Sequence, residues 1–177
     1  MPPAEYSLRL QRGTDLPSCR KRVLALTRAN FPLAGITGGF APPTPEAIHT
    51  ITKVENNTHL LITSATREIG TPDLKSLAPK SLLASSPHTD TAALVEELHG
   101  ILKKLPLESP PGSEDIYGMD VSIAWGSEDL EWCNGGPEGC GGGVSMVQAT
   151  EEEKRKFGRA VEIVEELVKR GEATEGY

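Results

Sequence analysis

Two cysteines close together in a glycine-rich run are the first candidates for chemistry. Cys133 and Cys140 lie in EWCNGGPEGCGGGVSM, residues 131–146, with six residues between them. Structural zinc sites usually pair ligands about two to four residues apart and need a second pair, whereas the third cysteine, Cys19, is distant in sequence. We therefore expect no metal site and no cofactor. A metal or redox protein that uses Cys133 and Cys140 stays open as a third alternative.

The same run can be tested as a disulfide or as a phosphate-binding loop. A disulfide needs an oxidising compartment, and the N-terminal MPPAEYSLRLQRG has no secretory signal pattern. A phosphate loop needs its glycines to open directly onto a helix, but VSMVQA intervenes and acidic neighbours such as Glu131 and Glu138 would repel an anion. Two interpretations remain, a mobile connector or a binding loop.

Two tryptophans flank the run and could anchor a partner. Tryptophan is enriched at the energetic centres of protein interfaces. The binding-loop interpretation therefore takes Trp125, Trp132, Cys133 and Cys140 as contact residues. Trp125 also continues the alternation of a predicted strand, as a core residue would.

Acid–base chemistry would depend on carboxylates and histidines. Six carboxylates surround the predicted strand MDVSIAW, and Asp120 lies on the polar face of that strand, where we expect a solvated edge. In the predicted hairpin His49 and His59 lie on opposite faces, so a site would combine one of them with Asp120. His99 lies opposite the apolar stripe of its helix, and we expect it at the surface. The sequence contains no serine-hydrolase, zinc-protease, P-loop or dinucleotide-binding motif.

Hydrophobic periodicity predicts the strands that must position these residues. Alternation predicts strands over residues 5–11 and 119–125. Two β-rich runs flank Asn56-Asn57 and predict a hairpin, because asparagine tolerates the positive φ of a two-residue turn. The predicted pairs are Thr52 with Leu61, Ile51 with Ile62, His49 with Ser64 and Ile48 with Ala65.

Helical spacing predicts three helices, over residues 16–31, 89–106 and 150–170. Cys19 falls on the core-facing stripe of the first. In the third, Thr150 and Glu153 form a capping box and Gly171 ends the helix. We expect a loop over 67–88, with a helical turn at DLKSL, and a last strand at VSMVQAT.

The predicted order is β-α-β-β-α-β followed by a further helix. This is the ferredoxin-like succession, and it predicts an α+β fold with a mostly antiparallel sheet, helices on one face and an additional C-terminal helix. Residues 1–177 fit one domain. We expect flexible loops at about 67–88 and 126–143.

Composition narrows the compartment and the partners. The formal net charge of −7 is unfavourable for nucleic-acid binding, and no stretch approaches the ~20 apolar residues that span a membrane. An odd, low count of three cysteines favours free thiols in a reducing cytoplasm. We therefore predict a soluble, acidic, cytoplasmic protein that binds a protein partner or a small-molecule ligand, and neither nucleic acid nor membrane.

Residues 6–105 resemble a known class of proteins. The strand RLQRG, a helix ending in ANFPL, the hairpin around Asn56-Asn57 and a closing helix are similar to the emfourin class of metalloprotease inhibitors. These are elements of a general kind, and the glycines expected after the first strand are missing, so no residue role is carried over.

Three functions follow as hypotheses. The first is a non-catalytic protein-binding module of inhibitory or regulatory type, which uses the acidic surface and the Trp/Gly-rich loop 125–143. The second is a small cofactor-free enzyme, of isomerase, cyclase or lyase type, in which His59 or His49 acts with Asp120. The third is the metal or redox protein described above.

Overall fold

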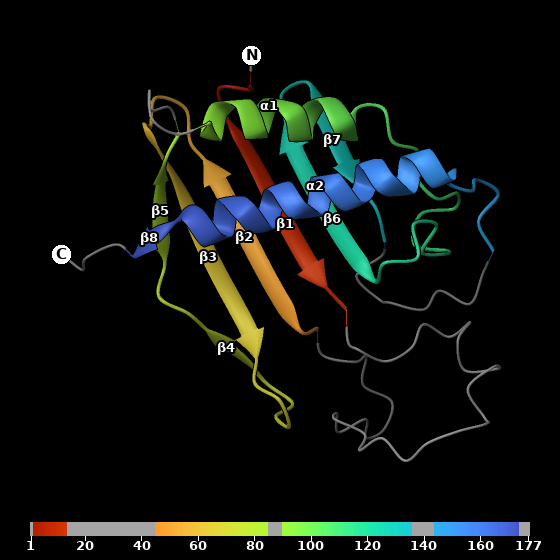
Figure 1. Cartoon of the computed structure of the whole chain (residues 1–177), viewed down its shortest axis with the longest axis horizontal. Coiled ribbons are helices and arrows are strands. Elements are labelled where there is room, and N and C mark those ends of the chain that lie inside the picture. The colour runs from red at the N-terminus through yellow and green to blue at the C-terminus, as the bar shows by residue number, and fades with distance from the viewer. Residues whose placement is uncertain (1, 14–44, 85–89, 136–143, 174–177) are drawn as a thin grey trace.

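The described residues form one antiparallel sheet of eight strands and two helices (Figure 1). The structure is a computed structural model and describes residues 2–13, 45–84, 90–135 and 144–173. The strands are β1 (Tyr6–Arg12), β2 (Ala47–Lys53), β3 (His59–Arg67), β4 (Leu74–Ser76), β5 (Lys80–Leu83), β6 (Val121–Ser127), β7 (Leu130–Cys133) and β8 (Glu172–Ala173); the helices are α1 (Thr91–Leu102) and α2 (Glu151–Arg170).

The strand order shows that the ferredoxin-like prediction is wrong. Across the sheet the order is β7-β6-β1-β2-β3-β5-β8, with β4 paired to β3, and every pair is antiparallel. A βαβ unit would make its two strands parallel, but β1 and β2 are direct antiparallel neighbours, with Leu8 opposite Ile51. Periodicity identifies strands, but it does not say which strand will be the partner. The helix predicted over 16–31, with Cys19, lies outside the described residues.

The predicted hairpin register is confirmed. β2 and β3 pair Thr52 with Leu61, Ile51 with Ile62, His49 with Ser64 and Ile48 with Ala65. Within the turn Asn56 has a φ of 61° and Asn57 does not have a positive φ. The turn is closed by Asn57 N–H, which donates to the Val54 carbonyl at 3.1 Å. The alternating apolar residues fix the register, because a slip of one residue would expose the buried side chains.

Four short segments differ from expectation. β4 and β5 lie within the predicted loop 67–88, and β4 takes up part of DLKSL, where we expected a helical turn. β7 lies within the predicted loop 126–143. VSMVQAT forms no strand and leads directly into α2. Strands of three or four residues are too short to show a period.

α2 is specified by its own sequence. The Thr150 side chain accepts from Glu153 N–H while the Glu153 carboxylate accepts from Thr150 N–H, so the predicted capping box is confirmed. The helix ends at Gly171, where an added Cβ would lie 2.8 Å from Ile62 Cδ1. Gly171 has a φ of −59°, so the glycine is needed for close approach to the sheet and not for a left-handed turn.

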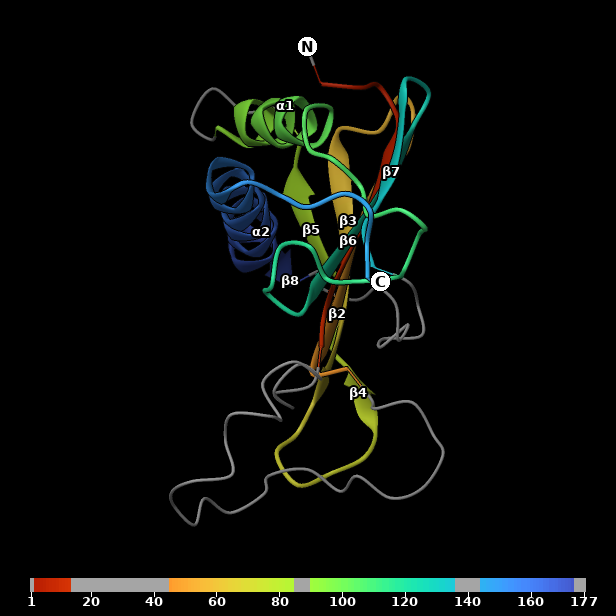
Figure 2. The ribbon, with the colours of Figure 1, turned by 90° about the vertical axis from the view of Figure 1, so that its right-hand side faces the viewer.

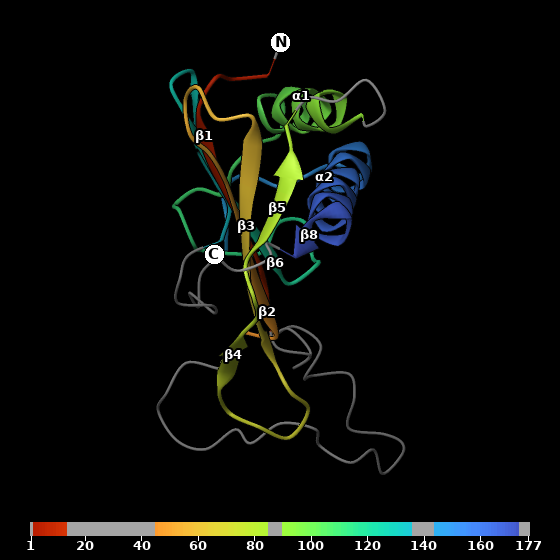
Figure 3. The ribbon, with the colours of Figure 1, turned by 90° about the vertical axis from the view of Figure 1, so that its left-hand side faces the viewer.

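Both helices lie on the same side of the sheet (Figures 2 and 3). Between the helices and the sheet lies the hydrophobic core, to which the sheet contributes Leu8, Leu10, Ile51, Leu60, Ile62 and Ile123, and the helices Leu98, Leu102, Phe157, Ile163, Val164 and Leu167. We call this side of the sheet the covered face. The other side, which neither helix covers, is called the open face.

Candidate functional site

Within the described residues, the open face is a side of the sheet that neither helix covers. Along β1 the buried Leu8 and Leu10 alternate with the exposed Ser7 and Arg9, because successive side chains of a strand point to opposite faces. The pairing register extends this alternation to the neighbouring strands. By this register the open face carries Ser7, Arg9, Gln11, Ile48, Thr50, Thr52, His59, Leu61, Thr63, Ala65, Arg67, Ser81, Leu83, Ser122, Ala124, Glu131 and Cys133.

Apolar side chains gather at one corner of the open face. Leu61 on β3 is 50% exposed, Leu83 on β5 is 38% exposed, and Val54 at the end of β2 is 54% exposed. His59 lies opposite Leu83 and is also exposed, with its Nδ1 2.9 Å from Thr58 Oγ1. Scattered apolar residues are normal at a protein surface, but apolar residues that gather on a flat, uncovered face mark a contact site. We call Val54, Leu61 and Leu83 the apolar corner.

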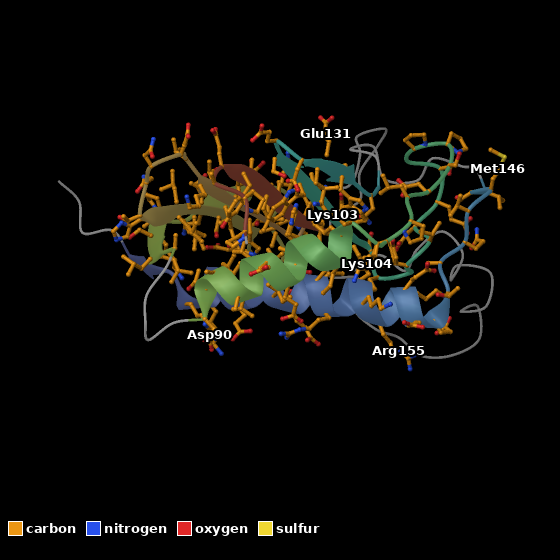
Figure 4. The ribbon with its side chains drawn as sticks, turned by 90° about the horizontal axis from the view of Figure 1, so that it is seen from above. Asp90, Lys103, Lys104, Glu131, Met146 and Arg155 are labelled. Carbon is orange, nitrogen blue, oxygen red and sulfur yellow. The ribbon has the colours of Figure 1, made fainter. Side chains whose placement is uncertain are left out.

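The rest of the open face is mostly small and polar, and it also carries Ile48. Threonine is the most frequent residue of its centre, with Thr50, Thr52 and Thr63. The charged residues of the face are Arg9, Arg67 and Glu131, and the Arg9 guanidinium donates to Gln11 Oε1 at 3.1 Å. Figure 4 shows Glu131 on the side of the sheet away from α1 and α2. With two arginines and one glutamate the described open face is slightly positive, whereas the whole chain has a net charge of −7.

Cys133 lies on the open face with a free, exposed thiol. Partial burial and the neighbouring Glu108 carboxylate raise the pKa of this thiol, and the Arg9 guanidinium opposes the shift. The thiol is therefore protonated near neutral pH, which makes it a weak nucleophile. The other predicted contact cysteine, Cys140, lies outside the described residues.

The two tryptophans are core residues and do not form a surface anchor. Trp125 is 2% exposed and Trp132 is 4% exposed, and they face each other across the β6–β7 pair. The Trp125 ring stacks on Tyr6 with centroids 4.9 Å apart, while Trp132 Nε1 donates to the Leu105 carbonyl. A two-residue turn at Glu128-Asp129 connects β6 and β7. In the sequence, this pair of polar residues between two tryptophan-containing segments is the feature that could have predicted the hairpin.

Glu108, which lies outside the predicted carboxylate cluster, and Asp115, a member of that cluster, both bind loop backbone. Buried Glu108 accepts from Gly112 N–H at 2.9 Å and from Gly135 N–H at 2.7 Å, so it fastens the start of the glycine run to the α1–β6 connection. Asp115 accepts three further amides, including that of Asp120 at 2.8 Å. Among the described residues no group of three or more His, Cys, Asp or Glu side chains could hold a metal ion.

Asp120 and the two candidate histidines are not brought together as one site. Asp120 has a φ of 54° and lies against Gly13 at the end of β1. His49 lies on the covered face and His59 on the open face, as predicted. The three residues therefore occupy two faces of the sheet and one of its ends.

His49 makes a cross-strand pair with Ser64, in which Nδ1 lies 2.8 Å from Ser64 Oγ. Burial lowers the pKa of His49, and the positive charges of Arg12 and Lys80 lower it further. Glu165 of α2 forms an ion pair with Arg12. A neutral imidazole beside a hydroxyl can act as a base, so the His49–Ser64 pair is the part of the covered face best suited to acid–base chemistry.

His99 is the residue that sequence reasoning placed wrongly. It is buried at 8% exposure, and its Nε2 lies 3.2 Å from Asp129 Oδ1. The Lys103 ammonium and then the Ser127 hydroxyl hold the pKa of Asp129 well below its usual range. The network fastens α1 to the β6–β7 turn. The spacing along α1 could have predicted this burial, because His99 lies four residues after the buried Val95 and therefore on the same side of the helix.

The chain has no match among known proteins that would indicate its function. No protein-family model matches the chain, and neither a curated protein nor a solved structure matches it. None of the helices in the described residues is long and apolar enough to cross a membrane.

Proposed function

We propose that the protein is a non-catalytic protein-binding module of inhibitory or regulatory type, and that its contact surface is the open face. The observation that carries the proposal is the one-sided cover of the sheet, in which α1 and α2 lie on the same face (Figure 2). This surface replaces the loop 125–143 as the contact site, since Trp125 and Trp132 are buried.

The composition of the open face supports a protein as the bound partner. The apolar corner supplies the desolvated centre that protein interfaces need, and the surrounding threonines supply hydrogen-bonding groups on stiff side chains. An antiparallel sheet can keep one face in water, but that face is then usually polar throughout. Leu61 at 50% exposure breaks the polar pattern of β3.

Site-specific photocrosslinking tests this proposal. A benzophenone side chain at Thr63, which is exposed on the open face, is expected to capture a protein in an extract of cells that make this chain. The same group at Glu162, which is exposed on α2, is the matched control and should capture none. Equal capture from both positions, or none from Thr63, would refute the proposal.

The His49–Ser64 pair favours a second candidate, a small cofactor-free enzyme. Its support is the 2.8 Å separation of His49 Nδ1 and Ser64 Oγ, together with the lowered pKa of His49. If the pair is reactive, a fluorophosphonate probe should label Ser64, because His49 accepts the hydroxyl proton as fluoride leaves. His49→Gln should abolish the labelling. Labelling equal to that of Ser7, on the open face, would rule out an activated serine.

A further inference from the structure

We propose that the protein occupying the open face is a second copy of this chain, so that two sheets stack face to face in a symmetric dimer. The inference rests on the proposed function, because it names the partner of the same surface. Stacked sheets about 10 Å apart, with interleaved side chains, are a common packing in proteins.

The area of the open face is sufficient for such a dimer. Five strands, β6, β1, β2, β3 and β5, lie side by side at about 4.8 Å spacing, and a seven-residue strand such as β1 is about 24 Å long. The face therefore offers about 600 Å² per copy, or about 1,200 Å² in total, which reaches the range of specific protein interfaces. The α1–β6 connection borders the face beside β6 and β7 (Figure 2).

Charge makes contact between two copies more favourable through the open face than through the rest of the surface. Two chains that each carry a net charge of −7 repel each other through most of their surfaces. The open face instead has Glu131 as its one described carboxylate, with Arg9 and Arg67, and the apolar corner has no charge. Contact through this face therefore avoids most of the like-charge repulsion, because the remaining acidic residues stay at a distance.

A two-fold axis that runs parallel to the strands, above the boundary between β2 and β3, would bring the apolar corners of the two copies together. This axis lies between the paired residues Thr52 and Leu61, so Leu61 of both copies approaches the axis and is buried on association. Self-complementary contact of this kind is the rule in two-fold dimers. Pairing through a sheet edge is less favourable, since the edge strands β7 and β8 have only four and two residues.

Light scattering after size-exclusion chromatography tests the dimer. Wild type is expected at twice the mass of one chain, with dissociation on dilution through about the micromolar range that interfaces of modest area show. Leu61→Lys is expected to raise the dissociation constant at least tenfold, because it buries two like charges near the axis. Ile69→Lys is the control, since Ile69 is 92% exposed in the β3–β4 connection.

A cross-linking variant makes the test independent of how Leu61→Lys folds. With the native cysteines replaced by serine, Thr52→Cys should give dimers with a short bis-maleimide, whereas Ile69→Cys should not. A monomer at all concentrations, or a dimer unaffected by Leu61→Lys and not cross-linked at Thr52, overturns the inference. If the protein is monomeric and Thr63 still captures a different protein, the proposed function stands without the dimer. If Thr63 captures nothing, both fail.

Discussion

The two faces of one sheet differ in what their side chains do, although the same strands supply both. On the covered face Leu8, Ile51 and Ile62 are fully buried under the helices, whereas on the open face Arg9, Thr52 and Leu61 alternate with them. The covered face stabilises the fold, and the open face is available for contact. Because each strand carries both, the same substitution can be made on either face and its effects compared directly.

The largest difference is expected for leucine. Leu8→Ala should lower the free energy of unfolding by about 2–5 kcal/mol, because it leaves a cavity in a packed core. Leu61→Ala should lower it by no more than about 1 kcal/mol, because half of that side chain is already exposed. Urea unfolding of both variants, at a protein concentration low enough for the monomer to dominate, measures this. Equal losses would mean that the open face is packed as tightly as the covered one.

Glutamate gives the next difference. Glu108→Ala should destabilise the protein by about 1–3 kcal/mol, because the part-buried amides of Gly112 and Gly135 lose their acceptor. Glu131→Ala, on the open face, should change the stability of the monomer by no more than about 0.5 kcal/mol. Thermal unfolding of the dilute proteins compares the two. A silent Glu108→Ala would contradict the anchoring role of that carboxylate.

Threonine should show a smaller effect. Thr150→Val removes the hydroxyl that accepts from Glu153 N–H and should lower stability by about 1 kcal/mol. Thr63→Val keeps the branched shape on the open face and should stay within about 0.5 kcal/mol. Chemical denaturation followed by circular dichroism is the measurement, and similar losses in both variants would count against the helix cap.

The smallest effect is expected from histidine and depends on pH. The pKa of His49 is lowered in the folded protein, so below the ordinary value of 6.5 the unfolded chain binds more protons. The stability contribution of neutral His49 is therefore complete above pH 6.5 and is lost as pH falls through the lowered pKa. NMR titration should give His49 a midpoint below 6.5, and His49→Gln should flatten the acid limb of the stability profile. The exposed His59→Gln is the matched control.

Local patterns predicted the hairpin and α2, because their determinants lie within a few residues of each other. Asn56 and the alternating β-branched residues fix β2–β3, and Thr150 with Glu153 fixes the start of α2. The strand order was not predictable in this way, since β1 finds its two partners at residues 47–53 and 121–127. Periodicity does not reveal which face of a sheet the helices will cover. The open face therefore had no sequence signal, and Trp132 was interpreted as a surface anchor.

The position of β1 has a consequence for how the chain folds. β1 precedes the other described strands in the sequence, yet it lies inside the sheet between β2 and β6, with Leu10 opposite both His49 and Ile123. One edge of β1 can pair soon after synthesis, whereas the other must wait until more than a hundred further residues have been added. Contacts of such long sequence separation slow folding. Until β6 arrives, the nascent chain exposes the β1 edge, and in this interval the protein is most vulnerable to mispairing.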